Sequence, residues 1–155
     1  MSGRIGVISD THGLLRPQAL AALDGCALIL HAGDIGDPQI LEALRRLAPL
    51  HAVRGNNDHG HWAEALPLAL TVEHAGLRIH LLHNVRELAL DPLATGIDVV
   101  VYGHSHKPRC EHHGGVLWFN PGSAGPRRFS LPIACGWLWA EGAAAQGEWQ
   151  PLALD

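Results

Sequence analysis

Short apolar runs alternate with helical patterns through the first half of the chain. Three runs of aliphatic and β-branched residues predict buried strands over residues 4–9, 28–31 and 50–54. Between them, residues 17–23 and 38–47 carry apolar positions at helical spacing, and proline stands at the start of the first helix. The order strand, helix, strand, helix, strand predicts a parallel sheet.

The second half of the chain, after Pro67, is rich in strand-like segments separated by Gly, Pro and Asn turns. These predicted strands cover residues 68–73, 77–82, 99–102, 116–119 and 133–140. A helical turn or two is expected near residues 91–95, and residues 142–147 predict a hairpin connection. The expected fold class is α/β, a layered sandwich of two packed mixed sheets flanked by helices, in a single domain over residues 1–155.

Composition supports a domain with a sizeable core. The chain has 155 residues, 47% of them hydrophobic, and its three cysteines include no C-x-x-C pair. A chain of this length can bury a core without disulfides. No apolar run approaches the ~18 residues of a membrane span, and the apolar segment at the N-terminus is too short for a signal peptide. We therefore expect a cytoplasmic protein with no membrane partner.

Charge and histidine content narrow the function classes. With 11 basic and 15 acidic residues, the formal net charge is −4, and this argues against a broad nucleic-acid surface, which needs clustered Lys and Arg. Histidine is unusually frequent, with 12 residues, and it is the commonest metal ligand in proteins. Only the positions of these histidines can decide whether they bind metal.

Potential metal ligands follow the ends of the predicted strands. Open α/β sheets place ligands at the carboxyl ends of their strands, so these loops should converge on one crevice. In an extended segment, side chains two residues apart face the same way, so His104 and His106 can serve neighbouring ions about 4 Å apart. The predicted cluster comprises Asp10, His12, Asp34, Asn56, His83, His104 and His106.

At these positions the chain resembles a known family, the calcineurin-like metallophosphoesterases, and within it the small bacterial and archaeal phosphodiesterase branch. The resemblance covers nearly the whole chain. Each motif alone is weak, but their order is specific: Asp10-Thr11-His12-Gly13, Gly33-Asp34, Gly55-Asn56-Asn57-Asp58, His83, Gly103-His104-Ser105-His106 and Asn120-Pro121-Gly122-Ser123. The fold implied is the calcineurin-like layered sandwich.

The resemblance also implies the ligand pattern. One divalent metal would be held by Asp10, His12, Asp34 and His106. The other would be held by Asp34, Asn56, His83 and His104, so that Asp34 bridges the pair. Manganese is the first choice of metal, and iron, zinc, nickel and cobalt also suit this ligand set. Asp34, His104 and Asn57 are the predicted catalytic residues.

The expected activity is hydrolysis of phosphodiesters by a hydroxide that bridges the two metals. The expected partner is a small phosphoester substrate, and a homodimer could complete a cleft that one small domain leaves open. Three alternatives stay open: a phosphomonoesterase, a cyclic-nucleotide phosphodiesterase, or a non-catalytic scaffold like the retromer-type subunits. An intact ligand set favours an enzyme over the scaffold.

Two positions depart from the family pattern. Many relatives have histidine where this chain has Asn57, and an amide cannot act as a general acid at neutral pH. We therefore expect a preference for esters with good leaving groups. Asn84 stands where relatives usually have glycine, and His83, which precedes it, could instead be a core histidine.

Other polar residues allow a structural as well as a functional interpretation. Asn56 also suits a tight turn, Asp58 favours a structural role, and His31 is expected to pack behind the site rather than bind metal. Four more residues could contact substrate or lie in solvated loops: His59, His61, Arg127 and Arg128.

Overall fold

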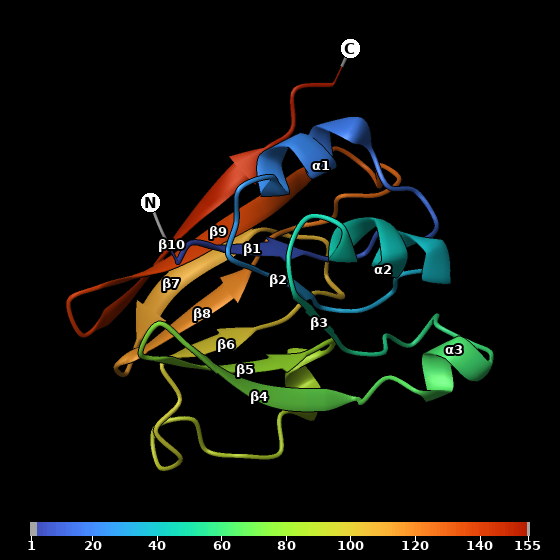
Figure 1. Ribbon diagram of the computed structural model, residues 1–155. Coiled ribbons are helices and arrows are strands. Elements are labelled where there is room, and N and C mark those ends of the chain that lie inside the picture. Colours follow the sequence, from blue (N-terminus) through green and yellow to red (C-terminus); the bar gives the residue numbers. More distant parts are fainter. Residues whose placement is uncertain (1–2, 155) are drawn as a thin grey trace.

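The computed structural model describes residues 3–154, which form two five-stranded sheets packed face to face (Figure 1). The first sheet has the order β10-β9-β1-β2-β3. Its strands are β1 (Ile5–Ile8), β2 (Leu28–His31), β3 (Leu50–Ala52), β9 (Ala134–Glu141) and β10 (Ala144–Pro151). The second sheet has the order β4-β5-β6-β8-β7. Its strands are β4 (Ala69–His74), β5 (Leu77–Leu82), β6 (Val99–Val101), β7 (Arg109–His113) and β8 (Val116–Asn120).

The main core lies between the sheets, as the alternation of apolar residues along the strands predicts. Ile5 and Val7 of β1 face inward, toward Leu81 of β5 and Phe119 of β8. Phe119 lies so close to the β9–β10 hairpin that a Cβ at Gly136 would come within 2.4 Å of its ring. A side chain at this glycine would therefore displace the aromatic ring.

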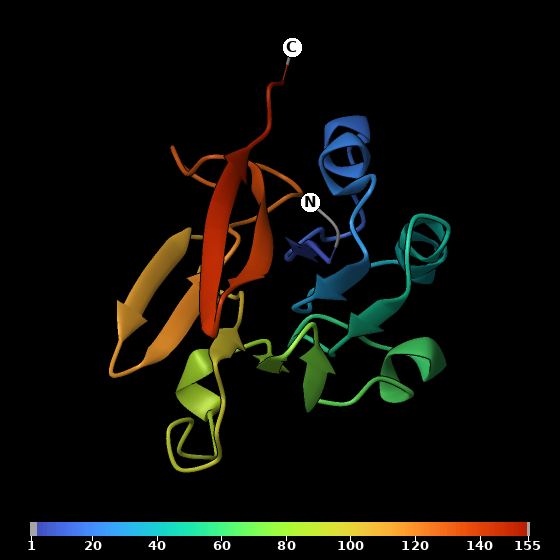
Figure 2. The same cartoon turned by 60° about the vertical axis from the view of Figure 1, so that its left-hand side comes forward.

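Two α-helices cover the first sheet. Figure 2 shows α1 (Pro17–Leu23) and α2 (Pro38–Arg45) on its outer face, where Leu23, Leu41 and Leu44 are buried. Proline opens both helices, and the Asp37 side chain accepts a hydrogen bond from the backbone N–H of Gln39 to cap α2. The outer face of the second sheet is covered by the connection after β5, which contains the 3₁₀ turn η1 (Val85–Glu87).

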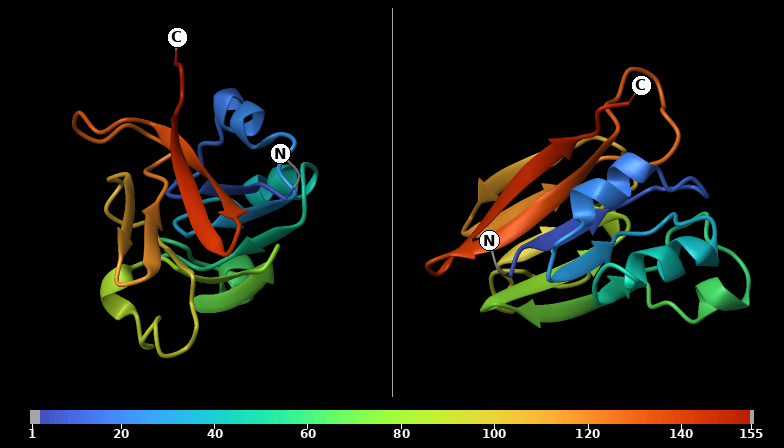
Figure 3. Two further views of the ribbon diagram at one scale, coloured as in Figure 1. Left: turned by 90° about the vertical axis from the view of Figure 1, so that its left-hand side faces the viewer. Right: turned by 45° about the horizontal axis from the view of Figure 1, so that its top comes forward.

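The sheet to which β9 belongs differs from the prediction. We expected residues 133–140 in the second sheet, but β9 pairs antiparallel with β1 of the first sheet, with Ile5 opposite Leu138. Figure 3 shows the β9–β10 hairpin running along β7 and β8, and His112 Nε2 donates to the Ala145 carbonyl oxygen at 2.8 Å. Pairing between residues so far apart in the chain leaves no local signal.

Several local predictions also differ from the structure. Residues 91–95 form hydrogen-bonded turns rather than a helix, and most of residues 142–147 belong to β10, so the hairpin turn itself is shorter. The second predicted helix ends at Arg45 instead of residue 47. Strand β7 and the short helix α3 (His61–Glu64) were missed, because β7 is exposed along its whole length and α3 is one turn long.

The topology brings the candidate ligands together. Strands β1, β2 and β3 are parallel, as predicted, and β5, β6 and β8 are parallel in the second sheet. Loops that follow strands of both sheets meet at one end of the sandwich. Within the part of the chain that the structure describes, no helix is long and apolar enough to span a membrane.

Candidate metal centre

Loops after five strands place the predicted ligands in two adjoining groups. Asp10 and His12 follow β1, Asp34 follows β2 and Asn56 follows β3. His83 follows β5, while His104 and His106 follow β6. The first group is Asp10, His12 and His106, and the second is Asp34, His83 and His104; in each, potential ligand atoms lie within 4.8 Å of one another.

The first group has three ligand atoms facing one point. His106 Nε2 lies 3.4 Å from both Asp10 Oδ1 and His12 Nε2, and His12 Nε2 lies 3.7 Å from Asp10 Oδ1. The His12 and His106 rings are stacked, with centroids 5.3 Å apart. Two imidazole nitrogens and a carboxylate oxygen at this spacing form a set that one divalent cation can use.

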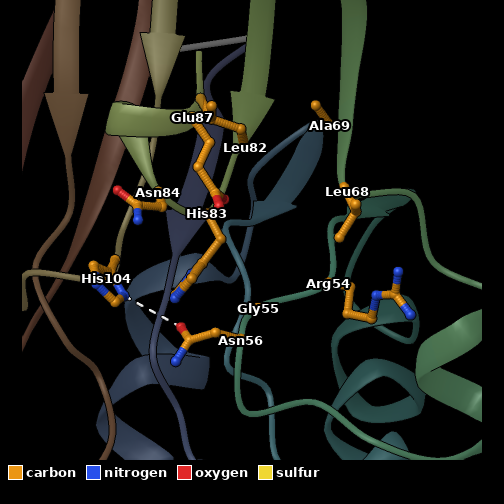
Figure 4. A pocket seen from close by; sticks show the side chains of 10 residues that line it. All are labelled: Arg54, Gly55, Asn56, Leu68, Ala69, Leu82, His83, Asn84, Glu87 and His104. Atoms are coloured by element: carbon orange, nitrogen blue, oxygen red, sulfur yellow. Dashed lines mark hydrogen bonds between the residues drawn. The ribbon is translucent and has the colours of Figure 1, made fainter. Parts of the chain in front are cut away.

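The predicted amide ligand, Asn56, adjoins the second group. His83 Nε2 is 3.2 Å from Asp34 Oδ2, and His104 Nδ1 is 3.2 Å from Asn56 Oδ1. Figure 4 shows His83, His104 and Asn56 converging at the lower left of a pocket. His83 is buried and contributes to the group even though Asn84 replaces the usual glycine. The Asn84 side chain accepts from the Arg86 N–H and caps η1 instead.

Asp34 belongs to the second group and also lies close to the first. Its Oδ2 is 3.2 Å from His83 Nε2 and 3.7 Å from His12 Nε2. A carboxylate with imidazoles of both groups in reach can bridge two ions. This is the position that the sequence analysis assigned to Asp34.

Backbone strain is concentrated at these residues. Among the described non-glycine residues, seven have a positive φ, and five of them are Asp10, His12, Asp34, His104 and His106. A left-handed conformation costs a residue with a Cβ about 1–3 kcal/mol and persists where the surroundings enforce it. The fold holds five loop residues in a costly conformation that directs their side chains to one place.

The donor set fits divalent metal ions. Asp10 Oδ1 and His83 Nε2 are buried and have no hydrogen-bond partner among the described residues, although buried polar atoms are normally paired. Both atoms point into the ligand groups. A bound cation would satisfy them, and the mixture of carboxylate, imidazole and amide donors suits borderline divalent metals.

Neighbouring groups orient the ligands. Ser9 Oγ donates to Asp10 Oδ2 at 2.7 Å and His104 N–H donates to it at 3.1 Å, so Oδ1 is the oxygen left for a cation. His83 Nδ1 donates to the Ala32 carbonyl oxygen at 2.8 Å, which leaves Nε2 with its lone pair toward Asp34.

The electrostatics of the carboxylates match this arrangement. Burial tends to raise the pKa of Asp34, but the neighbouring His83 imidazole and the hydrogen bond from the Asn57 N–H outweigh it and lower this pKa to about 2. Burial is likewise outweighed at Asp10, where His106 and His12 hold the pKa well below its ordinary value. Both carboxylates are therefore ionised at neutral pH.

His31 forms hydrogen bonds to both the loop that contains Asp10 and the loop that contains Asp34. The Gly33 N–H donates to His31 Nδ1 at 3.0 Å, so Nε2 carries the proton and donates to Thr11 Oγ1 at 3.1 Å. Complete burial lowers the pKa of His31 to about 4, which keeps it neutral. His31 packs behind the site, as expected, but its hydrogen bond to Thr11 has no signal in the sequence.

Asp58 and the segment 120–123 support the same loops. The Asp58 carboxylate accepts from the N–H groups of Gly36 and Gly55, both at 2.9 Å. Ser123 Oγ donates to the Asp10 carbonyl oxygen at 3.0 Å, and Asn120 Nδ2 donates to the Gly103 carbonyl oxygen at 3.1 Å. The segment 120–123 thus holds two ligand loops in place.

The remaining residues that the sequence singled out are not members of the two ligand groups. One of them contacts a ligand residue, and the others are exposed. Asn57 is exposed, and both its N–H and its side-chain amide donate to the Asp34 carboxylate, at 2.8 and 3.0 Å. His59 and His61 are exposed and do not line the pocket. Arg127 and Arg128 are exposed on the loop before β9.

A pocket of about 590 Å³ opens beside the second group (Figure 4). This pocket could not be predicted from the sequence, because its walls come from separate elements. It is lined by Arg54, Gly55, Asn56, Leu68, Ala69, Leu82, His83, Asn84, Glu87 and His104.

The fold and the paired ligand groups define an α/β sandwich with a candidate centre for two metals. The family model of the calcineurin-like phosphoesterase superfamily domain matches residues 4–141, so the chain belongs to this family. The resemblance seen in the sequence is thereby confirmed.

Individual relatives agree with this assignment. A probable metallophosphoesterase of Methanothermobacter thermautotrophicus is 36% identical over 83% of this chain and 81% of its own length. A phosphodiesterase of Methanocaldococcus jannaschii is 28% identical over 77% of this chain and 82% of its own length. Among solved structures, an archaeal phosphodiesterase is 25% identical with a TM-score of 0.76, covering 94% of this chain and 98% of its own. Vps29 of Chaetomium thermophilum is also 25% identical with a TM-score of 0.76, covering 90% and 82%.

Proposed function

We propose that this protein is a metal-dependent phosphodiesterase with two divalent ions at the paired ligand groups, manganese being the first choice. The observation that carries the proposal is the position of Asp34, which belongs to the second ligand group and lies within 3.7 Å of His12 in the first. When bound, two such ions supply a solvent-derived nucleophile at neutral pH and offset negative charge on the phosphoryl oxygens.

The chain's own residues prepare this chemistry. Asp10, His12 and His106 would hold one ion, and Asn56, His83 and His104 the other, with Asp34 shared. The hydrogen bond from Ser9 Oγ to Asp10 and the one from His83 Nδ1 to the Ala32 carbonyl oxygen fix which atom of Asp10 and of His83 faces the ions. Such preorganisation limits the rearrangement that the transition state requires.

Two observations favour diesters over monoesters. The Methanocaldococcus relative and the archaeal structure are both named phosphodiesterases. The pocket beside the second group also offers space for a second ester substituent, which a monoester lacks. We propose a small diester as the substrate, with a second copy of the chain as a further partner at the open side of the cleft.

Asn57 is proposed to limit the enzyme to good leaving groups. Its side-chain amide donates a hydrogen bond to the Asp34 carboxylate. An amide cannot supply a proton to a departing alkoxide at neutral pH. We expect Asn57→His to hydrolyse esters of poor leaving groups relatively faster, so that the plot of log kcat/KM against leaving-group pKa becomes less steep. Asn57→Ala, which removes only the bond to Asp34, should keep the native slope. Equal slopes for all three proteins would contradict this role.

The proposed activity is tested on metal-stripped protein with bis(4-nitrophenyl) phosphate and 4-nitrophenyl phosphate. We expect hydrolysis of the diester to appear when manganese is added and to exceed hydrolysis of the monoester. Preference for the monoester would indicate a phosphatase. No turnover with manganese, iron, zinc, nickel or cobalt would favour the scaffold alternative, which fold similarity to Vps29 leaves open.

A further inference from the structure

We propose that the pocket beside the second ligand group binds the non-reacting ester arm of the diester, and that Arg54 selects arms that carry a negative charge. This inference rests on the proposed function and adds a substrate class to it. The preferred arm has an apolar body next to the phosphate and an anionic group at its far end.

The pocket begins at the candidate metal centre and extends away from it. His83 and His104 belong to the second ligand group, Asn56 contacts His104, and all three line the pocket. Figure 4 shows Arg54 on the side opposite His104, with Asn56 between them. Arg54 and Asn56 are separated by one residue, so their Cα atoms are at most about 7 Å apart. A substituent on a phosphate at the second group can therefore reach Arg54.

Arg54 carries a charge that the fold leaves unmatched. Among the described residues, no carboxylate lies within 4.0 Å of its guanidinium group, whereas other arginines such as Arg45 and Arg109 have acidic partners. It is the only arginine or lysine that lines the pocket. Its backbone N–H donates to the Pro67 carbonyl oxygen at 2.9 Å, which fixes the chain at the base of the side chain. A guanidinium group is always charged and matches the geometry of carboxylate and phosphate.

Part of the pocket wall is apolar. Leu68, Ala69 and Leu82 line the pocket, and Leu68 is 64% exposed, so its side chain is available for contact with a bound group. The volume of about 590 Å³ lies within the range of small-molecule sites. An aromatic or other apolar group of moderate size would cover Leu68 on binding.

Glu87 places a negative charge on the side of the pocket opposite Arg54. Its side chain lies on the part of the pocket wall that η1 forms. Figure 4 shows it on the far side from Arg54, with Leu82 nearby. A carboxylate there repels an anion, so a charged arm gains by extending toward Arg54. The two walls together favour one orientation of an anionic arm.

The test compares two 4-nitrophenyl phosphodiesters that differ only in the second arm, phenyl or 4-carboxyphenyl. The leaving group is the same, so the ratio of their kcat/KM values reports recognition of the arm. We expect the native protein to prefer the 4-carboxyphenyl arm by roughly tenfold, through KM, as for a charge-assisted hydrogen bond in a partly exposed site. In Arg54→Gln this ratio should fall to about 1, and Arg54→Lys should retain part of it.

Arg86→Gln is the matched control, because Arg86 is an exposed cation next to Glu87 that does not line the pocket. It should keep the native ratio, whereas Glu87→Gln should raise it. A ratio that is unchanged in Arg54→Gln, or that falls equally in Arg86→Gln, would overturn the proposal.

A binding measurement separates failure of this proposal from failure of the proposed function. If no ester is hydrolysed, the function is wrong, but calorimetry with 4-carboxybenzyl methylphosphonate still reports on the pocket. Weaker binding to Arg54→Gln than to the native protein and Arg86→Gln would support the anionic subsite. Equal binding to all three would overturn it.

Discussion

Asp34→Ala is expected to reduce diester hydrolysis to the background rate and to lower the amount of bound manganese. Asp34 lies 3.2 Å from His83 of the second group and 3.7 Å from His12 of the first, so its loss weakens both sites. Its removal also leaves Asp10 as the one carboxylate near these histidines among the described residues. Activity with the chromogenic diester and metal content after gel filtration measure the two effects.

Asp24→Ala serves as the control, because Asp24 is an exposed carboxylate at the end of α1, far in the fold from the ligand loops. It should retain native activity and metal. Circular dichroism of Asp34→Ala checks that the variant is folded. Retained hydrolysis in a folded Asp34→Ala protein would refute the role of Asp34.

Gly55→Ala is expected to lower kcat/KM by about 100-fold or more, although it adds only one methyl group. A Cβ at this position would lie 2.2 Å from both the backbone nitrogen and Oδ1 of Asp34, far inside contact distance. Either the β3 loop with Asn56 or the β2 loop with Asp34 must move. A displacement of about 1 Å in a catalytic arrangement can cost roughly 100-fold in rate.

The control for this variant is Gly76→Ala, in the turn between β4 and β5. Gly76 has a φ of +82° and open space around its Cβ position, so alanine there adds backbone strain without crowding. We expect lower thermal stability but native kcat/KM. If Gly55→Ala kept native kinetics, the close contact of these loops would not matter for catalysis.

The candidate ligands could be predicted from the sequence because parallel strands end at a common edge. Asp10 and Asp34 each follow one of the parallel strands of the first sheet, and the structure brings both into the ligand groups. His83 was the least secure assignment from sequence. Its Nδ1 bond to Ala32 of a neighbouring loop accounts for its orientation, and this contact has no sequence signal.

Features that depend on distant packing could not be predicted. The β9 strand joins the first sheet through β1, which is separated from it by most of the chain. The pocket combines Arg54 after β3, Leu68 before β4 and Glu87 in η1, and no periodic pattern links these positions. The position of Asn57 was known, but its two hydrogen bonds to Asp34 follow from the turn of the β3 loop.

The most direct test of the two-metal centre is anomalous X-ray diffraction from crystals of the manganese-loaded protein. We expect two manganese peaks, one among Asp10, His12 and His106 and one among Asn56, His83 and His104, with the Asp34 carboxylate between them. A single peak, or manganese bound only elsewhere on the protein, would contradict the account.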